Sequence, residues 1–361
     1  MRPAGIGYPR PFLTSRTPTS ARPGRAIRAL AVIVAGAAAA AGCGSGATRT
    51  GTPASTTHTA RAASAAGAPS GRRATAARLA YRPLYSLPAP LQDPGAAALP
   101  GGRFVLMGGL DAADTSTAAV VLGDPHGARQ AAALPGAQHD AQAATLGGRA
   151  YLFGGGQFTQ YDHILAYDPG GGAVTQVGAL PQPASDVAVA GDGSTAYVVG
   201  GFNGTTALDT IVAWRPGSSA RVVGHLPTAL RYAATAYAGG AVIVAGGSTP
   251  GGEASDAVYR FSPATGTVRE IARLPAPLTH AGAAAVGGIV YLVGGRGADL
   301  SSQTSAVLAV NPGTGSVRSV GRLPQPLSDA GVLALGGAIL VAGGRSPAGT
   351  QAGVGELVPA G

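Results

Sequence analysis

The chain has 361 residues, of which 59 are glycine and 45% are hydrophobic, while only 11% carry a formal charge. This composition is too apolar for a wholly disordered chain and too rich in glycine for a helical bundle. The single cysteine is Cys43, which excludes an intramolecular disulfide and a zinc site built from several thiolates.

The net charge of +9 is unevenly distributed along the chain. Every basic residue is arginine, and the twelve arginines that precede Pro83 are accompanied by no acidic residue. The other thirteen arginines share the rest of the chain with all sixteen acidic residues, which gives that part a charge of −3. A weakly acidic domain has no electrostatic reason to bind phosphate backbones, so we expect no nucleic-acid partner.

Residues 1–42 have the features of a secretion signal. Arginines at positions 22, 25 and 28 precede an apolar run over residues 29–41, which is shorter than the roughly twenty residues of a membrane-spanning helix. The run ends in Ala-Ala-Gly-Cys43, which resembles a bacterial lipobox; the resemblance implies cleavage before Cys43 and acylation of its thiol. We therefore expect a lipoprotein at the outer face of the cell membrane, anchored in the bilayer through Cys43. An ordinary signal peptide with an incidental cysteine is the alternative.

Residues 43–76 are predicted to form a disordered tether. After Cys43 they consist of Ala, Gly, Ser, Thr, Pro, one His and scattered Arg, with no Leu, Ile, Val or Phe. Such a segment cannot bury enough apolar area to order itself.

Residues 77–361 repeat one pattern six times. An apolar segment closes on a glycine pair whose first member lies at 108, 154, 200, 246, 294 and 343, and Leu-Pro recurs at 87, 134, 180, 226, 274 and 323. Each period contains four short segments of strand type, joined by turn residues such as Gly287-Gly288 and Asn311–Gly315. Short strands at even spacing with hairpin turns predict an antiparallel all-β repeat protein.

This layout resembles the kelch repeat, whose mark is a glycine pair at the end of the second strand, followed by a polar loop. The resemblance implies a six-bladed β-propeller with one four-stranded antiparallel sheet per repeat. The aromatic residues before the proline turns, Tyr167, Trp214 and Phe261, are expected to pack between blades. The last repeat stops after three strands, and residues 77–84 look like a fourth, so we predict that this N-terminal strand completes the last blade.

No catalytic or cofactor motif is recognisable in the sequence. We find no phosphate loop, zinc motif or nucleophile elbow. Galactose oxidase contains a kelch-type propeller, but its copper chemistry needs a cysteine cross-linked to a tyrosine, and residues 77–361 contain no cysteine. We therefore expect no cofactor and no bound metal, and a binding role more than a catalytic one.

One position in each repeat is a candidate for ligand binding. Six residues after the leucine of each Leu-Pro pair stand Asp93, Asp140, Asp186, Tyr232, His280 and Asp329, which we expect to ring a central funnel. His139 and Arg231, each one residue earlier than such a position, complete the candidate set. These groups would suit a cation, a basic peptide or a sugar. The alternative is that they only solvate the strand starts and hydrogen-bond neighbouring loops.

These observations favour a cell-envelope lipoprotein whose propeller binds a protein or a glycan of the envelope through its loop face. A sugar-processing enzyme, such as the epimerases or mutarotases for which the kelch family offers a precedent, is the alternative, and a scaffold of an envelope assembly is a third possibility. An enzyme would concentrate a perturbed acid and base in one part of the funnel, whereas a binding module would spread polar contacts over several blades.

Overall fold

The computed structural model of the chain describes residues 76–361, which form strands, turns and loops. The chain divides into two units, residues 1–68 and 69–361. The first unit and residues 69–75 lie outside the described residues, so the predicted signal, Cys43 and nearly all of the predicted tether are not described. Within residues 76–361, no helix has the length and apolar character to cross a membrane.

The strands pair into antiparallel sheets of four. Four such sheets are separate, and in each the strand nearest the centre is named first. The first consists of β9 (Ala188–Gly191), β10 (Ala196–Val199), β11 (Thr210–Trp214) and β12 (Arg221–His225), and the second of β13 (Ala234–Ala238), β14 (Ala241–Ala245), β15 (Ala257–Ser262) and β16 (Thr267–Arg273). The third consists of β17 (Gly282–Val286), β18 (Ile289–Val293), β19 (Ala306–Val310) and β20 (Val317–Arg322), and the last of β21 (Gly331–Leu335), β22 (Ala338–Ala342), β25 (Gly353–Pro359) and β1 (Leu79–Ser86). A two-stranded ribbon of β23 (Arg345–Ser346) and β24 (Gly349–Thr350) accompanies the last sheet.

The first two repeats share one long strand and form a seven-stranded sheet. Its strands are β2 (Gly95–Leu99), β3 (Arg103–Met107), β4 (Thr117–Asp124), β5 (Gly127–Leu146), β6 (Arg149–Gly156), β7 (His163–Tyr167) and β8 (Val174–Ala179). Up to Gln138, β5 pairs with β4, and from His139 onward it pairs with β6. The sequence predicts a break at Leu134-Pro135, but β5 runs through it because Gln138 stays paired with Thr117. Each half of β5 therefore belongs to its own group of four strands.

The glycine pair after each second strand is required by close backbone packing. The first glycine of every pair has a φ between 60° and 65°. A Cβ atom there would lie 2.1 to 2.7 Å from a carbonyl oxygen of the chain, as at Gly246, where that oxygen belongs to Leu278. Any other residue would have to displace this carbonyl, and this explains the recurrence of glycine.

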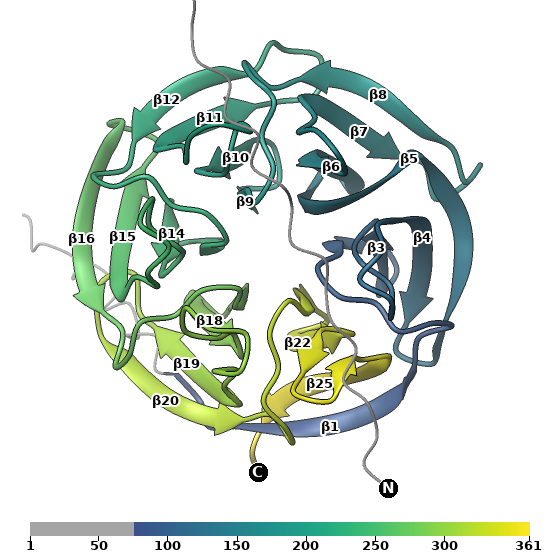
Figure 1. Ribbon diagram of the computed structural model, residues 1–361. Helices are drawn as coiled ribbons and strands as arrows, with labels where there is room; N and C mark the ends of the chain where they lie inside the picture. Colours follow the sequence, from purple (N-terminus) through teal and green to yellow (C-terminus); the bar gives the residue numbers. More distant parts are fainter. Residues whose placement is uncertain (1–75) are drawn as a thin grey trace, which may run out of the picture. The chain divides into compact units, whose positions relative to one another are not determined.

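The sheets are arranged around a central axis, and their inner strands face it (Figure 1). Each inner strand contacts the inner strand of the next sheet, and β21 contacts β2. Apolar cores fill the spaces between neighbouring sheets. Trp214, for example, packs edge-on against Tyr151 of the preceding group, with ring centroids 5.1 Å apart. Tyr167 and Phe261 are likewise buried between neighbouring sheets, which confirms the prediction for these aromatic residues. This arrangement fits a blade-type β-propeller.

The N-terminal strand β1 is the outermost strand of the last sheet. Its residues pair antiparallel with β25, from Leu79 opposite Pro359 to Ser86 opposite Gly353. Leu79 and Tyr81 pack on the core beside β20, while the Tyr85 hydroxyl donates to the Asp124 carbonyl oxygen at 2.6 Å. Strand β1 therefore contacts both the last group of strands and the first.

Candidate functional site

The six predicted positions form a belt around the axis. Asp93, Asp140, Asp186, Tyr232, His280 and Asp329 all have a φ between 53° and 57°. Five of their backbone N–H groups donate to the carbonyl oxygen of the equivalent residue in the preceding repeat, at 2.6 to 3.1 Å. One of these bonds joins the first repeat to the last, because the Asp93 N–H donates to the Asp329 carbonyl oxygen. The sixth, the Asp140 N–H, donates to a carboxylate oxygen of Asp93 at 2.6 Å. The belt, as we name these six residues, therefore joins all six repeats.

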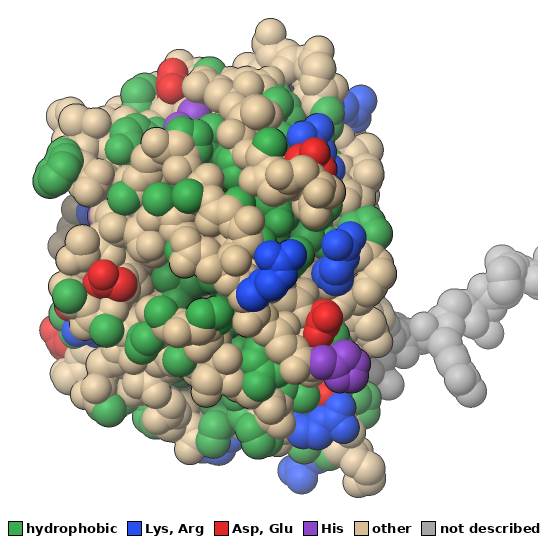
Figure 2. Space-filling model, turned by 90° about the vertical axis from the view of Figure 1, so that its right-hand side faces the viewer, with side chains coloured by type: hydrophobic (Ala, Val, Ile, Leu, Met, Phe, Trp, Pro, Cys, Tyr) green, Lys and Arg blue, Asp and Glu red, His purple; other side chains and the backbone are tan. Residues whose placement is uncertain are grey.

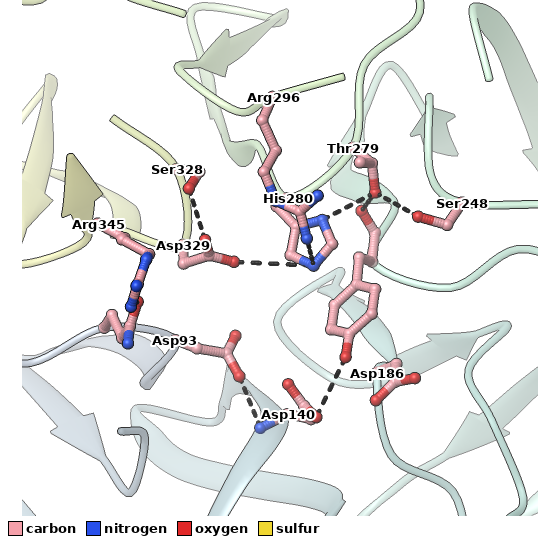
Figure 3. Close-up of polar contacts among 12 residues, drawn as sticks. Asp93, Asp140, Asp186, Ser248, Thr279, His280, Arg296, Ser328, Asp329 and Arg345 are labelled. Carbon is pink, nitrogen blue, oxygen red and sulfur yellow. Dashed lines mark hydrogen bonds and ion pairs between the residues drawn. The ribbon is translucent and has the colours of Figure 1, made fainter. Parts of the chain in front are cut away.

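The belt lines one end of an axial cavity of about 310 Å³. The remaining walls are the inner strands, whose cavity-lining residues are mostly alanine, such as Ala96–Ala98 and Ala283–Ala285. Small side chains leave the space open, and the belt supplies most of its polar groups (Figure 3).

Three aspartates occupy one side of the belt. Burial, and then the charge of Asp140, raises the pKa of Asp93 well above its usual range. The same two causes raise the pKa of Asp186 to about 7, although the nearby Arg231 guanidinium lowers it. The Arg231 Nε donates to the Asp186 carboxylate, whose side chain is only 2% exposed. A buried carboxyl group whose pKa is raised holds its proton to a higher pH than an exposed one, and in that form it can donate a hydrogen bond.

Two stacked rings occupy the other side of the belt. The Tyr232 and His280 rings lie 3.9 Å apart between centroids and 22° apart in orientation. The Tyr232 hydroxyl donates to Asp140 Oδ2 at 3.2 Å, so this side chain crosses the belt from the fourth repeat to the second. Together the rings present a flat aromatic group next to the carboxyl groups.

His280 is held as a neutral imidazole. Burial, and then the charge of Arg296, lowers its pKa well below its usual range. Arg296 donates to Nε2 at 3.0 Å, so Nε2 is an acceptor and Nδ1 carries the proton that faces Thr279 Oγ1 at 3.1 Å. Asp329 Oδ1 lies 3.9 Å from the same Nε2. Burial raises the pKa of Asp329, although the hydrogen bond that Ser328 donates to its other carboxyl oxygen lowers this pKa.

A second layer of side chains surrounds the belt on the loop side. In each repeat the residue before the belt residue forms a β-bridge with the residue after a glycine pair, as Arg231 does with Ser248 and Thr279 does with Arg296. Predicted residue His139 lies in this layer, where its Nδ1 is 2.8 Å from Ser116 Oγ. His139 and Arg231 do not line the axial cavity, whereas the six belt residues do.

Sequence reasoning missed two arginines of this layer. Arg296 and Arg345 each follow a glycine pair directly, and that position was a usable signal. Arg345 donates to Asp114 Oδ1 at 2.6 Å, whereas Arg296 makes no ion pair with a described carboxylate. No group of three or more His, Cys, Asp or Glu side chains within residues 76–361 is placed to hold a metal ion.

Comparison with known proteins identifies a fold and no family. No family model matches the chain. No curated protein matches it either. Among solved structures the chain is similar to that of YjhT, with a TM-score of 0.64 and 17% identity over 76% of this chain and 96% of that one. At this identity the similarity shows a shared propeller-like fold.

Proposed function

We propose that residues 77–361 form a six-bladed propeller of kelch type, closed by β1, and that its belt binds a carbohydrate of the cell envelope. Four separate four-stranded sheets, the two groups within the seven-stranded sheet and the contact between β21 and β2 support six closed blades. The same proposal places the protein at the outer face of the cell membrane, anchored through acylated Cys43. This part rests on the lipobox-like sequence alone.

The stacked pair of Tyr232 and His280 beside four carboxyl groups carries the carbohydrate assignment. A sugar ring has an apolar face that packs on an aromatic ring, and its hydroxyl groups both donate and accept hydrogen bonds. The carboxyl oxygens of Asp93, Asp140 and Asp186 accept hydrogen bonds, and Asp93 and Asp186, whose pKa values are raised, also donate when they hold a proton. A belt whose hydrogen-bonding groups are spread around the cavity suits a polyhydroxylated ligand.

The size of the cavity favours a small ligand over a folded protein. A volume of about 310 Å³ is at the lower end of the range for small-molecule pockets. One or two sugar units fill such a space, whereas a protein partner would have to insert a single side chain or a loop.

A glycan array probed with wild-type protein and with a Tyr232→Asn/His280→Asn variant tests this proposal. Asparagine tolerates a left-handed backbone, so the double substitution removes the aromatic surface and leaves the backbone of the belt intact. We expect affinity for the selected saccharide to fall roughly tenfold or more, because stacking and buried aromatic area are lost.

Tyr237→Asn is the matched control, because Tyr237 lines the same cavity on β13, away from the belt. It should bind the saccharide as wild type does. Equal losses in both variants, or no saccharide bound by the wild-type protein, would contradict the proposal.

A sugar epimerase or mutarotase is the second candidate, and the uneven distribution of perturbed groups favours it. Asp93 and Asp186, both with a raised pKa, lie on one side of the cavity, and the pKa of Asp186 is raised to about 7, so this group can exchange a proton with a ligand near neutral pH. Saturation-transfer NMR on the saccharide selected by the array distinguishes the candidates. Accelerated exchange between its anomers indicates the enzyme, and unchanged exchange indicates a binding module.

A further inference from the structure

The two ends of the propeller axis differ in the segments that form them. In each antiparallel group of four strands, the turns after the first and third strands lie at one end, and the loop after the second strand lies at the other. The belt and the loops after the glycine pairs therefore share one end, which we term the mouth face. The opposite end, the turn face, carries the hairpin turns, and neighbouring turns contact each other there, as Gly147 N–H does with the Gly193 carbonyl oxygen at 2.8 Å.

The charges of residues 76–361 are separated between these two faces. The turn face and the strand halves next to it hold ten arginines and five acidic residues: Arg78, Arg82, Arg103, Arg129, Arg149, Arg215, Arg221, Arg260, Arg269 and Arg318, with Asp124, Asp168, Asp192, Glu270 and Glu356. The mouth face holds the other five arginines and eleven acidic residues. A domain that is nearly neutral overall is thus positive at one end of its axis and negative at the other.

Five of these arginines occupy the same place in the outermost strands. They lie five residues before the leucine of a Leu-Pro pair: Arg82, Arg129, Arg221, Arg269 and Arg318, with Thr175 in the second repeat. All five are exposed, and within the described residues only Arg82 has a carboxylate within 4.0 Å. Figure 2 views the ring from its side, and its blue side chains gather toward the right-hand end of the axis.

We propose that the turn face docks on an anionic lipid surface, with the mouth face directed away from it. Arginines spread around the edge of one face meet a flat surface together, whereas a single polymer strand would reach only a few of them. The acidic mouth face is repelled by the same surface.

The point at which the chain enters the propeller supports this orientation. β1 runs from the turn face to the mouth face, and its start is fixed there by a bond from Ala360 N–H to the Arg78 carbonyl oxygen at 2.8 Å. The preceding 75 residues, which include Cys43, are therefore joined to the propeller at its basic face.

Two strands carry one arginine near each face, which makes the test specific; of these four arginines only Arg273 forms ion pairs within the described chain, with Asp256 and Glu270. β16 has Arg269 near the turn face and Arg273 at the mouth face, and β20 has Arg318 and Arg322 in the same places. We compare Arg269→Gln/Arg318→Gln with Arg273→Gln/Arg322→Gln in the full chain, both with Cys43→Ser to remove acylation. The measurement is co-sedimentation with vesicles of phosphatidylglycerol and phosphatidylcholine, and the arginines before residue 76 contribute equally to both variants.

The turn-face variant should bind roughly tenfold more weakly than its Cys43→Ser parent, whereas the mouth-face variant should change less than about twofold. Added salt should reduce the difference between the two. Equal affinities of the two variants, at equal melting temperatures, would overturn the proposal. A turn-face effect on binding to heparin without one on the vesicles would also overturn it, in favour of a soluble polyanion.

Discussion

At the scale of single residues, the belt depends on an unusual backbone conformation. Seven non-glycine residues of the described chain have a positive φ, and six of them are the belt residues. Asp and His adopt this region more readily than most residues, but Tyr232 adopts it at a cost of about 1 to 2 kcal/mol. The hydrogen bonds between successive belt residues and the stacking of the two rings offset this cost.

The pKa of Asp186 predicts a pH dependence of stability. The folded protein keeps the Asp186 proton up to a pH of about 7, while an unfolded aspartate releases it near 3.8. Between these values the folded state binds more protons, so this group makes the free energy of unfolding fall as pH rises. Asp186→Asn removes the dependence, and its unfolding free energy should vary less from pH 4 to 7 than that of wild type, by roughly 1 to 4 kcal/mol.

Denaturant unfolding at several pH values measures this difference. The control is Asp209→Asn, which changes an aspartate at the mouth face whose side chain is about half exposed. Arg231 is one-third exposed, so it can turn to solvent once its partner is neutral. A wild-type curve and an Asp186→Asn curve that run parallel across this range would contradict the assignment.

The belt positions could be predicted from the sequence because they are at a fixed distance from Leu-Pro in every repeat. Their individual environments could not. That Tyr232 crosses to Asp140 depends on a contact between residues 92 positions apart, and that Nε2 of His280 accepts from Arg296 depends on a loop reaching back over the belt. Spacing along the chain also could not separate His139 and Arg231 from the residues that line the cavity.

At the scale of strands, the two ends of the described chain meet in one sheet. The sequence predicts the N-terminal strand at residues 77–84, and β1 spans Leu79–Ser86 opposite β25. This pairing could be predicted because the last repeat lacks a fourth strand. The continuity of β5 could not, since Leu134-Pro135 looks the same in the sequence as the Leu-Pro pairs that end other outer strands.

Deletion of residues 77–85 should therefore unfold the propeller. It would expose the core that Leu79 and Tyr81 cover and would leave β25 as an unpaired edge. Differential scanning calorimetry measures the effect, and an equal deletion within the predicted tether, at residues 52–60, should leave the transition unchanged. A truncated protein with the melting temperature of the full chain would refute the role assigned to β1.

At the scale of the whole molecule, the repeats place the belt and a basic face at opposite ends of one axis. The axial cavity exists because the inner strands carry alanine, and the belt faces it because each repeat contributes one residue at the same height. A ligand at the mouth face and a lipid surface at the turn face could then be bound without interfering with each other.

A crystal structure of the protein with the saccharide selected by the glycan array tests the central claim most directly. The account predicts a sugar ring against Tyr232 and His280, with hydroxyl groups bonded to belt carboxyl groups. A saccharide bound at the outer strands or at the turn face, with the belt unchanged, would contradict it.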